Sequence, residues 1–110
     1  MSELAIGIDL GTSNSCVAVL RGGIIEVLPN AYGEATTASV VAIKEDGSVI
    51  VGNAAKANII HDPKHTIYSS KRLIGRFFFS EEVRKARAIC SYEITEAENH
   101  GVRIRIRITV

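Results

Sequence analysis

The sequence predicts an α/β fold, with a mixed, largely antiparallel sheet and short helices. Three observations support this prediction. Short apolar runs alternate with tight glycine turns over the first half of the chain, which is typical of an antiparallel meander. Beyond residue 52 the apolar spacing changes to one that favours helices. The last stretch, 102–110, alternates apolar and polar residues as a half-buried strand does.

The expected strands occupy most of the first half. Pro29 ends the third strand because it has no N–H group to donate to a ladder. Asp46-Gly47 is typical of a tight hairpin turn. The strands are expected at 5–9, 16–20, 24–28, 39–43 and 49–51, with turns at 11–15, 21–23 and 45–48 and a loop at 30–37.

The second half is expected to contain three helices. Asn53 and Thr66 are predicted to cap the first two, and Pro63 separates them. The third opens at Ser80, where two acids in the first turn complement the helix dipole. The helices are expected at 54–60, 67–73 and 81–88, followed by strands at 91–95 and 102–110 with a turn at 98–101.

A glycine- and hydroxyl-rich turn follows the first strand directly after the acid Asp9. Gly11 allows the backbone to reach a positive φ and to approach a ligand closely. The N–H groups of such a turn form a concavity for an anion, and Thr12, Ser13 and Ser15 add hydroxyl donors. Asp9 can hold a hard cation, directly or through its waters, and such a cation accompanies phosphate. The turn therefore indicates a phosphate-and-magnesium loop, although the same residues also form ordinary turns.

The composition fits one small globular domain of 110 residues, 46% of them apolar. The formal net charge of +1 gives no general attraction to nucleic acid or to a membrane surface. We expect no signal peptide and no membrane span, since the apolar runs are too short. The two cysteines, Cys16 and Cys90, indicate reduced thiols in a cytosolic-type compartment, with a disulfide between them as the less expected alternative.

Five segments of the chain resemble, in order and in spacing, the seventy-kilodalton heat-shock chaperones, the DnaK-like family. They are residues 6–19, 28–30, 35–42, 51–56 and 70–76, the last reading Ser70-Lys71-Arg72-Leu73-Ile74-Gly75-Arg76. The resemblance thins after about Phe79 and departs from the family pattern at Ala35 and Ala38, where an arginine and a proline are usual. It implies an actin-like ATPase (ribonuclease-H-like) fold. Residues 1–110 would form the N-terminal part of the nucleotide-binding domain, in its first lobe, without the rest of that domain or the peptide-binding domain.

The resemblance also assigns roles to individual residues. It implies that Lys71 reaches the nucleotide cleft and orients the water that attacks the γ-phosphate. From the residues alone, Lys71 is an ordinary solvated lysine on a short helix. The resemblance implies that Asp9 holds hydrated Mg²⁺ and that the β- and γ-phosphates of ATP are clasped by Gly11, Thr12, Ser13 and Asn14.

The function implied by the resemblance is that of an ATP-dependent molecular chaperone in the cytoplasm. ATP binding and hydrolysis would drive binding and release of unfolded client peptides in the full-length protein. A J-domain co-chaperone and a nucleotide exchange factor are the expected partners, and the fragment alone is expected to be inactive. Two alternatives stay open, a sugar kinase of the same fold and a non-enzymatic actin-like structural or binding module. The segment at 70–76 argues against the kinase.

Two other patterns are weaker candidates. Arg103, Arg105 and Arg107 share one face of the last predicted strand and form either a basic strip for an acidic partner or nucleic acid, or a solvated outer face. We expect the solvated face, because no aromatic residues lie between the arginines. His61 and His65 are four residues apart, but Pro63 breaks the helix that would align them, so we expect no metal site there.

Overall fold

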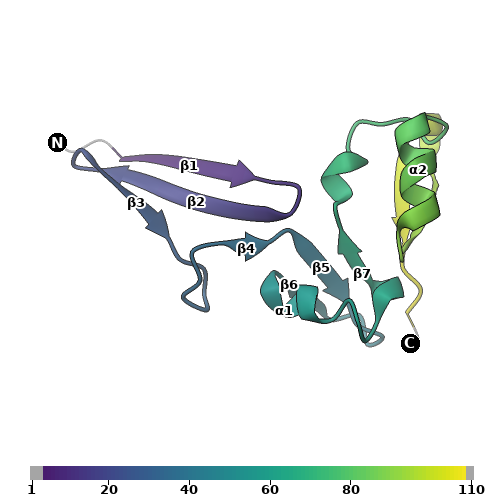
Figure 1. The fold of residues 1–110 in the computed structure, drawn as a ribbon, viewed down its shortest axis with the longest axis horizontal. Helices are drawn as coiled ribbons and strands as arrows, with labels where there is room; N and C mark the ends of the chain where they lie inside the picture. The colour runs from purple at the N-terminus through teal and green to yellow at the C-terminus, as the bar shows by residue number, and fades with distance from the viewer. Residues whose placement is uncertain (1–3, 109–110) are drawn as a thin grey trace.

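The computed structural model of the chain describes residues 4–108 and has an elongated outline (Figure 1). Its principal extents are 50 × 30 × 23 Å, and the radius of gyration of the Cα atoms is 16.9 Å. A compact domain of this length has a radius of gyration of about 13 Å. The elongation arises because three sheets follow one another along the longest axis and do not pack around one common core.

The first sheet contains the predicted hairpin and the third predicted strand. Its order is β1–β2–β3, and the short β4 pairs with the start of β2. Because Leu10 lies opposite Ser15, the hairpin turn spans 11–14 and is one residue shorter than predicted. Asn14 already belongs to β2, since it pairs with Ala38 of β4. The strands are β1 (Leu4–Leu10), β2 (Asn14–Arg21), β3 (Ile24–Leu28) and β4 (Thr37–Ala38).

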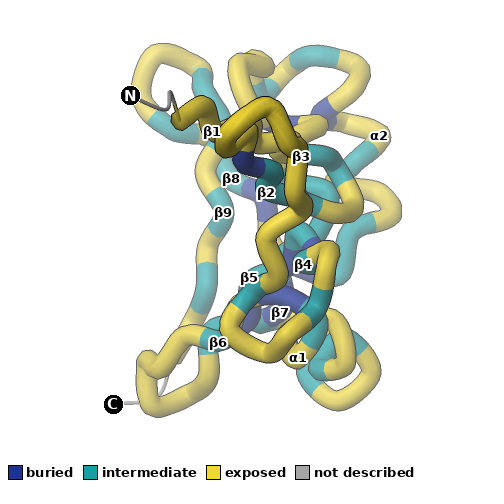
Figure 2. Tube along the Cα trace, turned by 90° about the vertical axis from the view of Figure 1, so that its left-hand side faces the viewer, coloured by how far each residue is buried: buried dark blue, intermediate teal, exposed yellow. Residues whose placement is uncertain are grey.

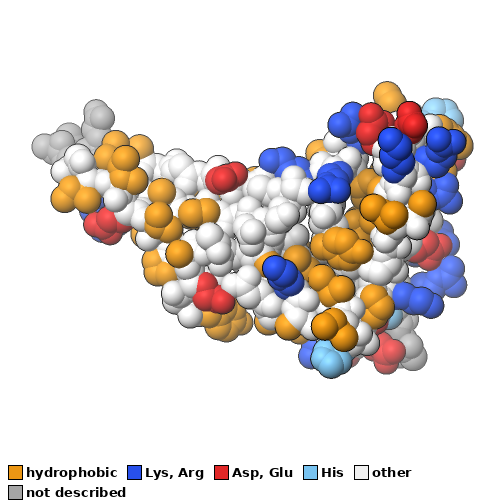
Figure 3. Space-filling view, viewed as in Figure 1, with side chains coloured by type: hydrophobic (Ala, Val, Ile, Leu, Met, Phe, Trp, Pro, Cys, Tyr) orange, Lys and Arg blue, Asp and Glu red, His pale blue; other side chains and the backbone are white. Residues whose placement is uncertain are grey.

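Most of this first sheet is exposed to solvent (Figure 2). Among its described residues outside β4, only Val19 is buried. The alternate residues Leu4, Ile6, Ile8 and Leu10 form one apolar face of β1, and each is about two-thirds exposed. Hydrophobic side chains are correspondingly prominent over this end of the molecule in Figure 3. The sheet therefore depends on its hydrogen-bond ladder much more than on a core.

The second sheet lies in the middle of the molecule, with β5 (Val40–Ile43) as its central strand. β6 (Val49–Val51) and β7 (Thr66–Tyr68) both pair antiparallel with it. The helix α1 (Asn53–Ala57) follows β6, and Ala55 of this helix is fully buried against the sheet. The small core of this unit consists of Ala38, Val40, Ala42 and Ala55.

The third unit joins α2 (Glu81–Ile89) to a hairpin of β8 (Glu93–Glu96) and β9 (Val102–Arg105). As predicted, Ser80 caps α2, and its hydroxyl accepts the N–H of Val83. The core of this unit consists of Leu73, Val83, Tyr92 and Ile94. The described residues also form three short 3₁₀ helices: η1 (Pro63–His65), η2 (Ser70–Arg72) and η3 (Glu98–His100).

All strand pairs among residues 4–108 are antiparallel. The α/β class with short helices and antiparallel pairing is therefore confirmed, but the described chain forms three small sheets and not one mixed sheet. The actin-like architecture stays a prediction.

The predicted helix over 67–73 is wrong. Residues 66–68 form β7 instead, because two β-branched residues and a tyrosine pair with β5 and suit a strand better than a helix. Thr66 is not a helix cap. Its side chain is fully buried, and its hydroxyl donates to the carbonyl oxygen of Asp62 at 2.8 Å. Only residues 70–72 of the predicted helix are helical, as the 3₁₀ helix η2.

Asn53 is not a helix cap either, and α1 is shorter than predicted. The side-chain oxygen of Asn53 accepts the N–H of Ala38, and its amide donates to the carboxylate of Glu34 at 2.6 Å. Asn53 therefore ties the loop before β4 to α1. A proline at position 38, usual in the family that the sequence resembles, has no N–H for this bond.

The final strand is also shorter than predicted. β9 ends at Arg105, and residues 106–108 continue without strand pairing, while 109 and 110 lie outside the described residues. The predicted alternation is nevertheless present, since Val102, Ile104 and Ile106 are partly buried and the arginines between them are exposed.

Candidate functional site

The turn between β1 and β2 is the predicted phosphate loop. Gly11 at its start does not have the positive φ that we expected, so that part of the prediction is wrong. The requirement for glycine is steric instead. A Cβ atom at Gly11 would lie 2.2 Å from the carbonyl oxygen of Asn14, a separation that no side chain tolerates. Glycine therefore allows the turn to close tightly.

Ser39 braces this turn from the neighbouring sheet, a role that we did not predict. Its hydroxyl donates to the carbonyl oxygen of Gly11 at 2.8 Å, and its N–H donates to the carbonyl oxygen of Ser13 at 2.9 Å. The hydroxyl of Ser15 lies 2.9 Å from that of Ser39, so Ser15 supports the turn and is not the free donor that we expected. A serine beside a strand carries no local signal of such a long-range contact.

Lys71 also contacts the chain at the start of this turn. Its Nζ donates to the carbonyl oxygen of Leu10, at 2.5 Å, immediately before Gly11. The side chain is exposed, so its charge is solvated and accessible. The structure thus brings Lys71 next to the turn, although the two are far apart in the sequence.

The central strand β5 explains why Ser39 and Lys71 meet at one place. Ser39 directly precedes β5, and Val40 at the start of β5 pairs with Tyr68 at the end of the antiparallel β7. η2 follows β7 at once, so Lys71 emerges at the same end of the β5–β7 pair as Ser39. Ser69 lies between β7 and η2 and adopts a left-handed conformation with φ 54°, which turns the chain from the strand into the 3₁₀ helix.

The donors of the turn remain available to a ligand. Within residues 4–108, the N–H and hydroxyl groups of Thr12 and Ser13 make no hydrogen bond to protein. Asn14 is exposed at the start of β2, where it pairs with Ala38. The turn therefore offers backbone N–H groups and two hydroxyls, with the Lys71 ammonium bonded directly before it, and this set of donors suits a phosphate group.

Asp9 is exposed on β1, two residues before Gly11. Among residues 4–108, no group of three His, Cys, Asp or Glu side chains could hold a metal ion by itself. Mg²⁺ in proteins is commonly held by one or two carboxylates, with phosphate oxygens and water completing its octahedron. A single carboxylate beside a phosphate-binding turn therefore fits Mg²⁺ that arrives with a nucleotide.

The pair His61 and His65 does not form a shared site. Nδ1 of His65 lies 2.7 Å from the Asp62 carboxylate, and Nε2 lies 2.5 Å from the carbonyl oxygen of Arg107. Both nitrogens can donate at once only when the ring is protonated. The hydrogen bond to Asp62 raises the pKa of His65 above its ordinary value, and the bond to the Arg107 carbonyl adds a smaller effect in the same direction. Both acceptors favour the protonated ring. His61 is exposed on the loop after α1.

Among residues 4–108, no helix is long and apolar enough to cross a membrane. A small α/β protein with an acid, a tight glycine turn carrying free donors and a lysine against that turn has the features of a phosphate-binding protein. Comparison with protein families then identifies the chain more closely. The family model described as Hsp70 protein matches residues 5–109.

The chain therefore belongs to the Hsp70 family, a family of chaperones. This confirms the resemblance found in the sequence and extends it beyond residue 79, after which the resemblance thinned. The family implies ATPase activity in its full-length members, which generally bind ATP or ADP with Mg²⁺. It also implies client peptides and co-chaperones as partners in general.

Proposed function

We propose that the chain forms the N-terminal part of the ATPase domain of an ATP-driven chaperone, in the first lobe of that domain. The observation that carries the proposal is the hydrogen bond from Lys71 to the Leu10 carbonyl, which brings a cation to a turn with free donors. In the full-length protein, ATP binding and hydrolysis would switch a peptide-binding domain between weak and tight states through a population shift. The expected location is the cytoplasm.

The turn would bind the phosphates of ATP with groups that the protein already holds in place. The N–H groups at residues 11–14 and the hydroxyls of Thr12 and Ser13 would donate to the β- and γ-phosphates. Asp9 would hold hydrated Mg²⁺, which neutralises phosphate charge when bound. The braces at Ser39 and Lys71 support this role, because a turn fixed before binding loses less conformational entropy on binding.

Lys71 would act on the water that attacks the γ-phosphate. Its Nζ donates to a backbone carbonyl oxygen, which is a neutral acceptor. An ammonium group has three donors on a flexible stem, so Lys71 can keep a contact with the turn and also orient a water. Its charge would stabilise the negative charge that develops on the transferred group.

The partners follow from this function. Unfolded client peptides, a J-domain co-chaperone and a nucleotide exchange factor are proposed for the full-length protein. Membership of the Hsp70 family supports the chaperone over the two alternatives from the sequence, the sugar kinase and the actin-like module.

Replacing Lys71 in the full-length protein tests the proposal. We expect Lys71→Ala to slow single-turnover ATP hydrolysis at least about a hundredfold, equivalent to about 2.7 kcal/mol in the barrier. ATP affinity should change much less, because the donors of the turn remain. Lys85→Ala, which removes an exposed lysine of α2, is the matched control and should hydrolyse ATP normally. Near-normal hydrolysis by Lys71→Ala would refute the assigned role.

A further inference from the structure

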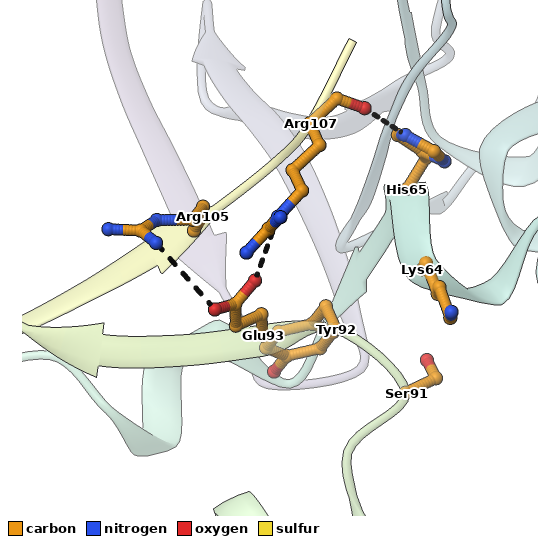
Figure 4. Close-up of a pocket in the computed structure, with 7 residues that line it drawn as sticks. All are labelled: Lys64, His65, Ser91, Tyr92, Glu93, Arg105 and Arg107. Atoms are coloured by element: carbon orange, nitrogen blue, oxygen red, sulfur yellow. Dashed lines mark hydrogen bonds and ion pairs between the residues drawn. The ribbon is translucent and has the colours of Figure 1, made fainter.

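A second polar pocket lies away from the turn, between η1 and the β8–β9 hairpin (Figure 4). Its volume is about 400 Å³, within the range of small-molecule sites. Neither the turn at 11–14 nor Lys71 contributes to it. The lining residues are Lys64, His65, Ser91, Tyr92, Glu93, Arg105 and Arg107.

The lining carries more positive than negative charge. Three of the lining side chains are cationic, Lys64, Arg105 and Arg107, and one, Glu93, is a carboxylate. The ion pairs from Glu93 are long, 3.9 Å to Arg105 and 3.6 Å to Arg107. All three side chains are well exposed, so these pairs contribute little stability and the guanidinium groups can turn to another anion.

His65 shapes one wall of this pocket. Its Nε2–H donates to the carbonyl oxygen of Arg107, which fastens the segment after β9 against η1. The Arg107 side chain is thereby held over the pocket, where Figure 4 shows it pointing toward Glu93. The pocket therefore depends on a contact between parts of the chain that are distant in sequence.

Ser91 supplies an unsatisfied hydroxyl at the opposite wall. Among residues 4–108, its Oγ is the one buried side-chain oxygen or nitrogen without a hydrogen-bond partner. Figure 4 shows the Ser91 hydroxyl and the Lys64 amine directed toward each other across the pocket. Buried polar groups in proteins nearly always have a partner, so an unpaired one at a pocket indicates a missing acceptor.

We propose that this pocket binds a phosphate group, supplied either by the free ion or by a phosphate monoester. Guanidinium groups match phosphate oxygens with paired donors, and a lysine and a serine hydroxyl add donors from another direction. A tetrahedral dianion offers several oxygens to donors that approach from different directions. A monocarboxylate has fewer oxygens and less charge, and would compete poorly with the Glu93 carboxylate already in the pocket.

Titration of the ¹⁵N-labelled chain with inorganic phosphate tests this site. Chloride must be adjusted to keep the ionic strength constant, because exposed charges are screened by salt. We expect saturable amide shifts at η1, at residues 91–93 and at 105–107, with a dissociation constant of about 1 mM. Shifts confined to the turn at 11–14 would overturn the proposal, as would shifts without saturation.

Four variants make the test specific. Arg107→Gln should weaken phosphate binding about tenfold, because it removes a charge-assisted donor. Arg103→Gln is the matched control, since it removes the same charge from an exposed residue of β9 outside the pocket, and it should bind normally. Ser91→Ala should weaken binding severalfold. Equal losses for Arg107→Gln and Arg103→Gln would mean general charge attraction and would overturn the site.

Glu93→Gln distinguishes a binding pocket from ion pairs that only support the fold. Removing the competing carboxylate should tighten phosphate binding by about threefold or more. Weaker binding by this variant would contradict the proposal. Glycerol phosphate in place of phosphate distinguishes the two sources: equal affinity indicates monoesters, and much weaker affinity indicates the free ion. Acetate that binds as tightly as phosphate would contradict the preference for a dianion.

Discussion

The Lys71 amine donates a hydrogen bond to the carbonyl oxygen of Leu10, 61 positions earlier in the chain. The bond joins the end of β1, in the first sheet, to η2, which follows the last strand of the second sheet. It places a cation one residue before the tight turn at Gly11. Since Ser39 donates to the adjacent carbonyl group, that of Gly11, the candidate phosphate loop is held by two side chains from outside the hairpin.

Ser39→Ala should destabilise the chain by about 1–2 kcal/mol. The variant leaves the Gly11 carbonyl and the Ser15 hydroxyl without their partner, and both are partly buried. Denaturant unfolding measures the loss. Ser15→Ala is the matched control, because it removes only the contact between the two hydroxyls and should cost less. An equal loss for both variants would show that the bond to Gly11 contributes nothing.

Asp9→Asn should make ATP binding by the full-length protein insensitive to Mg²⁺. The amide keeps the shape of the side chain but removes the charge that would attract a hydrated cation. Equilibrium binding with and without Mg²⁺ measures the effect as a ratio of affinities. Glu26→Gln, at an exposed acid on β3 of the same sheet, should keep the ratio of the unmodified protein. The metal role is wrong if Asp9→Asn keeps that ratio as well.

The 110-residue chain alone should bind Mg·ATP no more tightly than about 1 mM and should not hydrolyse it. The few donors of the turn and one lysine each contribute about 0.5–1.5 kcal/mol net, or up to about 3 where a charge assists. The loss of translational and rotational freedom is at least about 4 kcal/mol. Isothermal titration of the folded chain measures the affinity. A micromolar dissociation constant would mean that the chain carries, or assembles, a complete site.

Protonation of His65 should stabilise the folded chain on the acidic side of neutrality. The hydrogen bonds to Asp62 and to the Arg107 carbonyl, with the nearby Glu45, raise the pKa of His65. The contribution is then fully present below the unfolded pKa of about 6.5 and is lost as the pH rises through the higher folded pKa. Unfolding measured from pH 5 to 8 should show this component, and His65→Gln should remove it. His61→Gln should retain it, and a His65→Gln profile that matches the unmodified chain would contradict the prediction.

The sequence predicted the local elements well where turn chemistry decides the structure. Glycine turns and the Ser80 cap have short-range causes, so β1, β2, β3 and α2 lie close to their predicted positions. The predicted helix over 67–73 was wrong because pairing of residues 66–68 with β5 outweighs any helical preference. Sequence spacing does not reveal that pairing. The prediction that Asn53 caps a helix failed for a similar reason. Its side-chain amide bonds to Ala38 and Glu34, which lie 15 and 19 positions earlier in the chain.

The candidate site was predicted in part from chemistry and in part from resemblance. The acid, the glycine turn and the hydroxyls are adjacent in the sequence, so residues 9–13 could be recognised directly. Lys71 could not, because nothing in its surroundings distinguishes it from other lysines; the resemblance alone singled it out. Ser39 was missed altogether, since its role depends on how β4 and β5 meet the turn.

The exposed first sheet has a consequence for hydrogen exchange. β5 is paired on both edges and carries buried side chains, so its amide protons should exchange only when the whole chain unfolds. β1 and β3 have little buried surface and should exchange through local opening. The turn at Gly11 lies between the slowly exchanging β5 and the rapidly exchanging first sheet. A ligand that joins the turn to Lys71 would therefore slow amide exchange throughout β1 and β2, far beyond the atoms that it contacts.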